Sequence, residues 1–195
     1  MEWDAALPLV VTRDGRLITS GTVTGNNAKR GLYIWDLRSG RVLKSYPILA
    51  DTISPDGRWA AWSEYENGSK IILFDLDAGK AALTLVPPFP TVMRVAFTPD
   101  GRRILATERD GSSMMLWDTA NGAMVQKLAG DPSQVTTVAF SSDGKLLAAA
   151  GYAGYTIKVW DVGAAKLVQT FPREAAGTSA GTSGDVRLPA TAPHP

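Results

Sequence analysis

A pattern of turn and aromatic residues recurs four times along this chain of 195 residues, and it constrains the fold more than any other feature. The glycine of an Asp-Gly pair recurs at steps of 42, 44 and 43 residues, at Gly15, Gly57, Gly101 and Gly144. An aromatic residue followed by Asp recurs at steps of 39, 43 and 43 residues, at Trp35, Phe74, Trp117 and Trp160. Two independent landmarks with nearly the same spacing indicate four copies of one structural unit.

Each copy contains four short segments in which apolar and polar residues alternate, as they do in half-buried strands. The first two segments flank the Asp-Gly pair, where Asp bonds its own backbone and Gly supplies a positive φ, so a hairpin turn is expected. A second turn follows the aromatic-Asp pair, with a glycine four residues past the Asp, at Gly40, Gly79 and Gly122. The fourth copy has Ala165 at this place and Gly163 two residues earlier, so we expect a differently built turn there. Four strands joined by tight turns form an antiparallel meander.

These features resemble the WD-repeat β-propeller family over roughly residues 7–171. The resemblance is carried by the Asp-Gly turns and by the pairs Trp35-Asp36, Phe74-Asp75, Trp117-Asp118 and Trp160-Asp161. The family's Gly-His dipeptide is missing from every copy, so the copies resemble the degenerate repeats of many bacterial propellers. The only histidine is His194, which excludes the buried His–Ser/Thr–Asp–Trp hydrogen-bond network of the family. Residues 54–75 also resemble the propeller repeats of TolB-type proteins and of the regulatory domain of prolyl-oligopeptidase-type enzymes.

The resemblance implies an all-β fold, a β-propeller of four four-stranded antiparallel blades that is an incomplete ring or half of a larger propeller. The expected blades cover about residues 7–46, 47–87, 88–130 and 131–171. Blades bury their apolar faces only against neighbours, and propellers of this family usually close with six to eight blades. Four blades therefore leave two end faces bare. Three solutions stay open: further blades in a longer chain, which we favour, a homodimer that completes an eight-bladed ring, or closure of the four blades alone.

The composition narrows the functional classes. A net charge of +1 gives no electrostatic footprint for nucleic acid, and no apolar stretch approaches the roughly twenty residues that span a bilayer. The N-terminus shows no signal peptide, so we expect a cytoplasmic protein without nucleic-acid or membrane partners. Residues 172–195 are rich in Ala, Gly, Ser, Thr and Pro, which predicts a disordered tail after a domain of residues 1–171.

The inventory of reactive side chains predicts a protein that is not an enzyme. Residues 1–171 lack histidine and the chain lacks cysteine, so Ser-His-Asp and Cys-His arrangements are excluded. Asp56, Asp100 and Asp143 recur once per copy like a ring of metal ligands, but the glycine after each one explains it as a turn residue. We therefore expect no catalytic residue, no metal and no cofactor.

Binding residues of such scaffolds are expected in loops. By resemblance, partners dock where the second strand meets the third and where successive blades join. The candidate partner-binding residues at these places are Asn26, Arg30, Tyr65, Glu66, Phe89, Arg109, Asp110, Tyr152 and Tyr155. Trp59 lies two residues past the turn glycine, where the other copies have Leu17, Arg103 and Leu146. Trp59 and Trp62 are therefore assigned equally to packing and to binding.

This mixed, aromatic and weakly charged surface predicts a non-catalytic scaffold for protein–protein interaction, which binds a protein or peptide. Two alternatives stay open. The chain could be the propeller part of a hydrolase, either lactonase-like or the gating domain of a peptidase. It could also be a truncated gene fragment without independent function.

Overall fold

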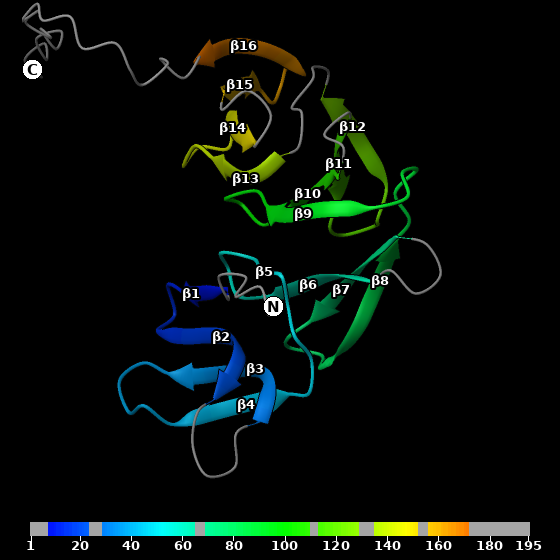
Figure 1. Ribbon diagram of the computed structural model, residues 1–195. Helices are drawn as coiled ribbons and strands as arrows, with labels where there is room; N and C mark the ends of the chain where they lie inside the picture. Colours follow the sequence, from blue (N-terminus) through cyan, green and yellow to red (C-terminus); the bar gives the residue numbers. More distant parts are fainter. Residues whose placement is uncertain are drawn as a thin grey trace, which may run out of the picture.

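The computed structural model describes residues 8–23, 29–64, 69–109, 113–128, 135–151 and 156–171, which fold into four four-stranded antiparallel sheets (Figure 1). The first blade contains β1 (Leu9–Val11), β2 (Arg16–Val23), β3 (Lys29–Asp36) and β4 (Val42–Tyr46). The second contains β5 (Thr52–Ile53), β6 (Trp59–Glu64), β7 (Lys70–Asp75) and β8 (Lys80–Leu85). The third contains β9 (Val92–Phe97), β10 (Arg103–Glu108), β11 (Met114–Asp118) and β12 (Met124–Leu128). The fourth contains β13 (Val135–Phe140), β14 (Leu146–Gly151), β15 (Ile157–Asp161) and β16 (Lys166–Phe171).

The four sheets follow one another along an arc that stays open on one side (Figure 1). Within each sheet the strands pair in the order in which they occur in the chain. The first strand of each blade lies on the inner side of the arc and the last strand on the outer side (Figure 1). The all-β propeller architecture with an unclosed ring is therefore confirmed. The predicted tail, residues 172–195, lies outside the described residues.

Apolar side chains fill the three junctions between successive blades. The junction of blades one and two buries Ile18, Leu32, Ile34, Ala50, Ile53, Ala60, Phe74 and Leu76. The junction of blades two and three includes Trp59, Ala61, Leu73, Phe97, Ile104 and Trp117, and that of blades three and four includes Leu105, Leu116, Leu147, Trp160 and Val162. The core therefore consists of three layers between blades, and each layer includes the ring of the aromatic-Asp pair on the third strand of the later blade, Phe74, Trp117 or Trp160.

The two tryptophans of uncertain role both take part in packing. Trp59 is buried between blades two and three. Trp62 is partly buried against the junction of blades one and two, and its indole N–H donates to Glu64 Oε1 at 3.1 Å. The packing assignment is therefore correct for Trp59, whose ring is closed to a partner.

A Ser or Thr hydroxyl organises each Asp-Gly turn. The hydroxyl donates to the turn carboxylate two residues later, in the pairs Thr12–Asp14, Ser54–Asp56, Thr98–Asp100 and Ser141–Asp143. The same oxygen accepts a backbone N–H from beyond the turn. The turn glycines have φ values between 69° and 83°, so the predicted hairpin chemistry holds in all four blades.

The turn of the first blade is one residue shorter than the others. Thr12 Oγ1 accepts the N–H of Arg16, four residues on, whereas Ser54 Oγ accepts the N–H of Trp59, five residues on. Arg16 pairs with Asp36 in the same way as Trp59 pairs with Asp75. Aligning Leu17 with Trp59 by counting from the glycine was therefore wrong, because the structural counterpart of Trp59 is Arg16.

The second turn of the fourth blade is built like the other three, contrary to our expectation. Ala165 has a φ of 54°, close to the 66–72° of Gly40, Gly79 and Gly122. Asp161 Oδ1 accepts the N–H of Ala164 at 2.8 Å, as Asp75 does in blade two with the N–H of Ala78. The carboxylate fixes the turn before the left-handed position is reached, so an alanine is forced into a conformation that favours glycine.

Candidate functional site

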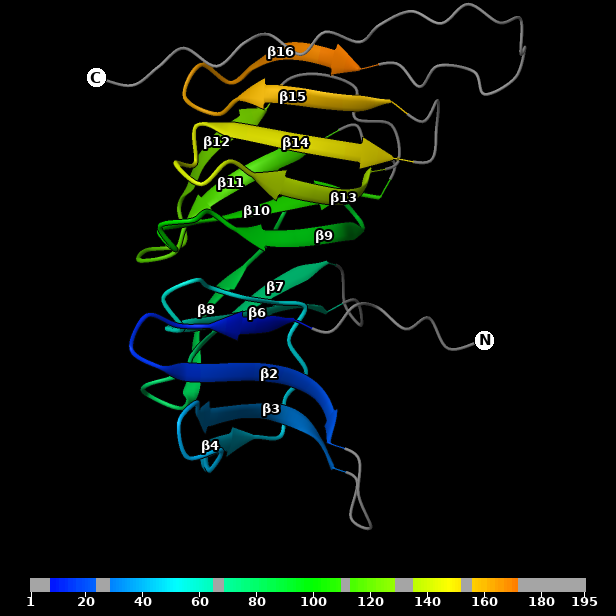
Figure 2. The same ribbon diagram turned by 90° about the vertical axis from the view of Figure 1, so that its left-hand side faces the viewer.

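The tight turns lie on one rim of the arc, and the end of each second strand and the start of each third strand lie on the opposite rim. Figure 2 shows the turns between first and second strands and between third and fourth strands on one side of the molecule. The second and third strands connect on the other side, as the meander requires. We call these the turn rim and the loop rim. Among the candidate binding residues that the structure describes, Arg30 and Arg109 belong to the loop rim.

Two of the predicted loop-rim residues are exposed. Arg30 lies near the start of β3 opposite Thr22, and Arg109 follows β10, where its backbone N–H donates to Thr91 O at 3.0 Å. These two arginines belong to blades one and three. The other predicted residues Asn26, Tyr65, Glu66, Asp110, Tyr152 and Tyr155 lie outside the described residues.

Phe89 does not belong to an exposed surface, so this part of the predicted site is wrong. Its exposure is 6 %, and it lies in the core between blades two and three with Leu85, Val92 and Val95. Phe89 stands in the proline-rich connector between these blades. Removing an aromatic ring from water is favourable, so the ring of Phe89 packs into the junction, where a partner cannot reach it.

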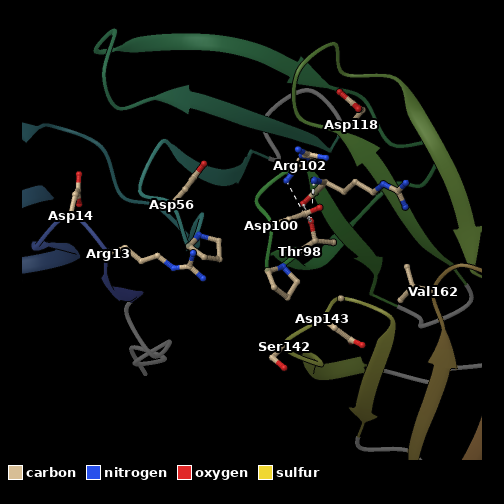
Figure 3. A pocket seen from close by; sticks show the side chains of 14 residues that line it. Arg13, Asp14, Asp56, Thr98, Asp100, Arg102, Asp118, Ser142, Asp143 and Val162 are labelled. Atoms are coloured by element: carbon tan, nitrogen blue, oxygen red, sulfur yellow. Dashed lines mark hydrogen bonds between the residues drawn. The ribbon is translucent and has the colours of Figure 1, made fainter.

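The turn rim encloses an open cavity of about 1000 Å³, which sequence reasoning did not find (Figure 3). All four blades contribute to its lining, which includes Arg13, Asp14, Asp56, Thr98, Asp100, Arg102, Arg103, Asp118 and Asp143. The sequence did carry a signal, because the turn aspartates that line the cavity recur once in each copy, at Asp14, Asp56, Asp100 and Asp143. Only the arc brings these four separate turns around one hollow.

Hydrogen bonds hold the carboxylates of Asp14 and Asp143 on this rim and favour their charged forms. The Ser141 hydroxyl, and then the backbone N–H of Lys145, hold the pKa of Asp143 below its ordinary value. The Thr12 hydroxyl does the same for the pKa of Asp14, whose second oxygen lies 2.7 Å from Arg16 Nε. Lys145 Nζ lies 3.5 Å from Asp143 Oδ2. The rim therefore presents charges of both signs in a rigid frame.

Each turn carboxylate has one oxygen, Oδ1, committed to its turn. Asp100 Oδ1 accepts the Thr98 hydroxyl at 2.6 Å and the backbone N–H of Arg102 at 3.1 Å (Figure 3). Among the residues that the structure describes, there is no group of three or more histidine, cysteine, aspartate or glutamate side chains able to hold a metal ion. Their role as turn residues, predicted from the glycine that follows each one, accounts for these aspartates.

The two ends of the arc present apolar side chains to solvent. On blade one these include Leu9, Val11, Leu37 and the paired rings of Tyr33 and Trp35, whose centroids lie 5.9 Å apart. On blade four they include Leu146, Ile157 and Phe171. The bare end faces expected from the number of blades are therefore present.

In the described part of the chain, no helix has the length and apolar character needed to cross a membrane.

Comparison with known proteins identifies the repeat. Residues 122–161 match the family model described as WD domain, G-beta repeat. The match runs from just before β12 to the end of β15, so the repeated sequence unit spans the junction of blades three and four. No curated protein matches the chain.

A solved structure, Kuenenia stuttgartiensis hydrazine synthase, has a similar fold, with a TM-score of 0.64 at 15% sequence identity. The alignment covers 87% of this chain and 50% of that one, so the chain spans half the length of the solved protein. An identity this low shows likeness in fold alone. Together with the repeat match, it confirms the resemblance to WD-repeat β-propellers.

Proposed function

We propose that this chain, with its WD-repeat propeller fold, is a non-catalytic scaffold that presents its rims to a protein or peptide partner in the cytoplasm. WD repeats generally mediate protein interactions. The observation that carries the proposal is the turn-rim cavity of about 1000 Å³, which all four blades line. Loops and turns on a rigid frame are where such scaffolds place their binding residues.

The cavity suits a polar segment of a protein chain. Arg13, Arg102 and Arg103 line its wall, as does Asp143, whose lowered pKa favours its charged form. A peptide with acidic side chains would bind the arginines through charge-assisted hydrogen bonds, and its backbone N–H groups would meet the carboxylates. The lining mixes both signs of charge, which favours a peptide over a polyanion.

The loop rim is the second part of the proposal. Arg30 and Arg109 are exposed there, and the sequence predicts that Tyr152 and Tyr155, which come between β14 and β15 in the chain, also bind the partner. Tyrosine and arginine are residue types that dominate interface energy. The bare end faces take further propeller blades, from a longer chain or from a second copy.

Paired substitutions in an affinity-capture experiment with the full chain distinguish binding at the turn rim from binding at the loop rim. Arg13→Glu with Arg102→Glu changes the turn rim, and Tyr152→Ala with Tyr155→Ala changes the loop rim. The pair on the binding rim should weaken capture of a partner by more than about 1 kcal/mol, roughly fivefold, with an unchanged circular dichroism spectrum. Lys127→Glu on the outer strand β12 is the control. Capture that survives both pairs contradicts the proposal.

A further inference from the structure

The two end faces match, position by position, the two sides of the junctions inside the arc. Strand register defines the equivalence, because Leu17 pairs with Trp35 as Leu147 pairs with Trp160. Leu37 follows the aromatic-Asp pair in blade one as Val162 does in blade four. Leu147, Trp160 and Val162 are all buried against blade three. The bare face of blade one is therefore the kind of face that packs on a preceding blade.

The bare face of blade four is of the complementary kind, which packs on a following blade. Ala148 pairs with Val159 and Val159 with Gln169, as Leu105 pairs with Leu116 and Leu116 with Gln126 in blade three. Ile157 corresponds to Met114, which is fully buried between blades three and four. These equivalent positions are Ala148, Ile157, Val159 and Gln169, on a face that no further blade covers among the described residues.

The positions that pack inside the arc recur on both bare faces. On the bare face of blade one, Trp35 stands at the place of Trp160, and Tyr33 stands at the place of Lys158. On the bare face of blade four, Ala148 and Val159 stand where blade three has Leu105 and Leu116, which are buried in the junction of blades three and four. Both bare faces therefore keep apolar side chains at positions that are packed inside the arc.

A polar contact between blades also has a counterpart at the ends. Gln126 Nε2 donates to the backbone oxygen of Val162 in the next blade at 2.5 Å. Lys44 Nζ, at the equivalent place in blade one, donates to Asp77 O in the next blade at 3.2 Å. Gln169 occupies this place in blade four, and the carbonyl of Leu37 is its expected acceptor. Apolar and polar parts of the two faces therefore fit the same junction.

We propose that a second copy of this chain covers both end faces, and that the two copies join head to tail into an eight-bladed ring. The face of blade four in each copy packs on the face of blade one in the other, which gives two identical heterologous junctions. The inference rests on the bare end faces named in the proposed function. It is independent of the partner that binds a rim.

The first test is the mass of the full chain in solution, measured by light scattering after size-exclusion chromatography and by sedimentation over a wide concentration range. We expect a particle of twice the mass of the 20.8 kDa chain. A monomer at all concentrations overturns the proposal. Open-ended growth into longer oligomers overturns the closed ring, because a head-to-tail junction that does not close gives filaments.

The second test uses three aspartate substitutions at apolar residues of similar exposure. Leu37→Asp changes the face of blade one (51 % exposed), Ile157→Asp that of blade four (47 %), and Val125→Asp the outer strand of blade three (46 %). Leu37→Asp and Ile157→Asp should each turn the dimer into a monomer, with at least a hundredfold weaker association. Val125→Asp should remain dimeric. Circular dichroism spectra establish that each variant is folded.

Mixing the two monomeric variants distinguishes a head-to-tail junction from a symmetric one. Leu37→Asp retains an intact blade-four face, and Ile157→Asp retains an intact blade-one face, so the mixture should form a heterodimer with one junction. A mixture that stays monomeric overturns the head-to-tail arrangement. Capture of a rim partner by the monomeric variants reports on the proposed rim function separately, so the failure of either idea leaves the other measurable.

Discussion

Replacing Ser54 by alanine should destabilise the protein far more than replacing Ser141, although both residues fill the same place in their turns. Ser54 is fully buried, and its hydroxyl donates to Asp56 Oδ1 at 2.5 Å and accepts the N–H of Trp59 at 2.8 Å. Ser141 makes the same two bonds, to Asp143 and from the N–H of Leu146, in an exposed turn. The chemistry is equal and only the access of water differs.

The loss in the free energy of unfolding depends on whether the polar groups that lose their partner can bond to water instead. Ser54→Ala removes two hydrogen bonds of about 1 kcal/mol each and leaves the N–H of Trp59 without its acceptor, which costs about 1–3 kcal/mol when water cannot replace it. The expected loss in the free energy of unfolding is about 2–4 kcal/mol. Water solvates the groups left by Ser141→Ala, so about 0.5–1 kcal/mol is expected there.

Equilibrium unfolding in urea, followed by tryptophan fluorescence at one protein concentration, measures both losses. Ser54→Thr is the matched control, because threonine keeps the hydroxyl and occupies this place as Thr12 and Thr98 in blades one and three. It should recover most of the stability. Equal losses for the two alanine variants, or a loss below about 0.5 kcal/mol for Ser54→Ala, would refute the reasoning about buried hydroxyls.

Three further predictions concern the turns and the junctions. Gly57→Ala should lower the free energy of unfolding by about 3 kcal/mol, because the φ of Gly57 is +70° and a Cβ there would stand 2.5 Å from a side-chain carbon of blade one. A Cβ at Gly15 would meet nothing within 4 Å, so Gly15→Ala should lose about 1 kcal/mol in the same urea titration. The Ser141 hydroxyl lowers the pKa of Asp143 from 3.8, so this carboxylate stabilises the fold above about pH 4 and ceases to do so as the pH falls through its lowered pKa. Between pH 2 and 6, the free energy of unfolding of Asp143→Asn should therefore fall less steeply with decreasing pH than that of the unchanged protein. An equally steep fall would contradict this assignment. Trp160→Ala should cost about 3–5 kcal/mol in thermal or urea unfolding, since the ring is fully buried between blades; a loss near 1 kcal/mol would mean that the junction does not pack as described.

The parts of the fold that local chemistry determines could be predicted from the sequence. Four residues suffice to specify an Asp-Gly hairpin, and the spacing of the aromatic-Asp pairs specifies how many strands each unit has. The shorter first turn escaped prediction, because the glycine was taken as the reference when the hydroxyl of Thr12 sets the register. Ala165 escaped it for a related reason, since its left-handed conformation follows from the cap that Asp161 forms four residues earlier.

The features that depend on contacts between blades could not be predicted. Phe89 lies in a connector, which the sequence alone predicts to be exposed, but the packing of blade two against blade three buries its ring. The turn-rim cavity likewise exists only where four separate turns meet around a common hollow. Sequence reasoning therefore located the loops that could bind a partner, and it missed a surface that the arc itself creates.

Every hydrogen-bonded strand pair belongs to a single blade, and no sheet borrows a strand from its neighbour among the residues described. Neighbouring blades are thus joined by side chains and by one stretch of covalent chain, and separating them would leave every ladder of backbone hydrogen bonds intact. When such a molecule is pulled from its two ends, it should unfold one blade at a time, and each step should lengthen the chain by the contour length of one blade. The same construction lets gene duplication lengthen the array by entire units without disturbing those already present.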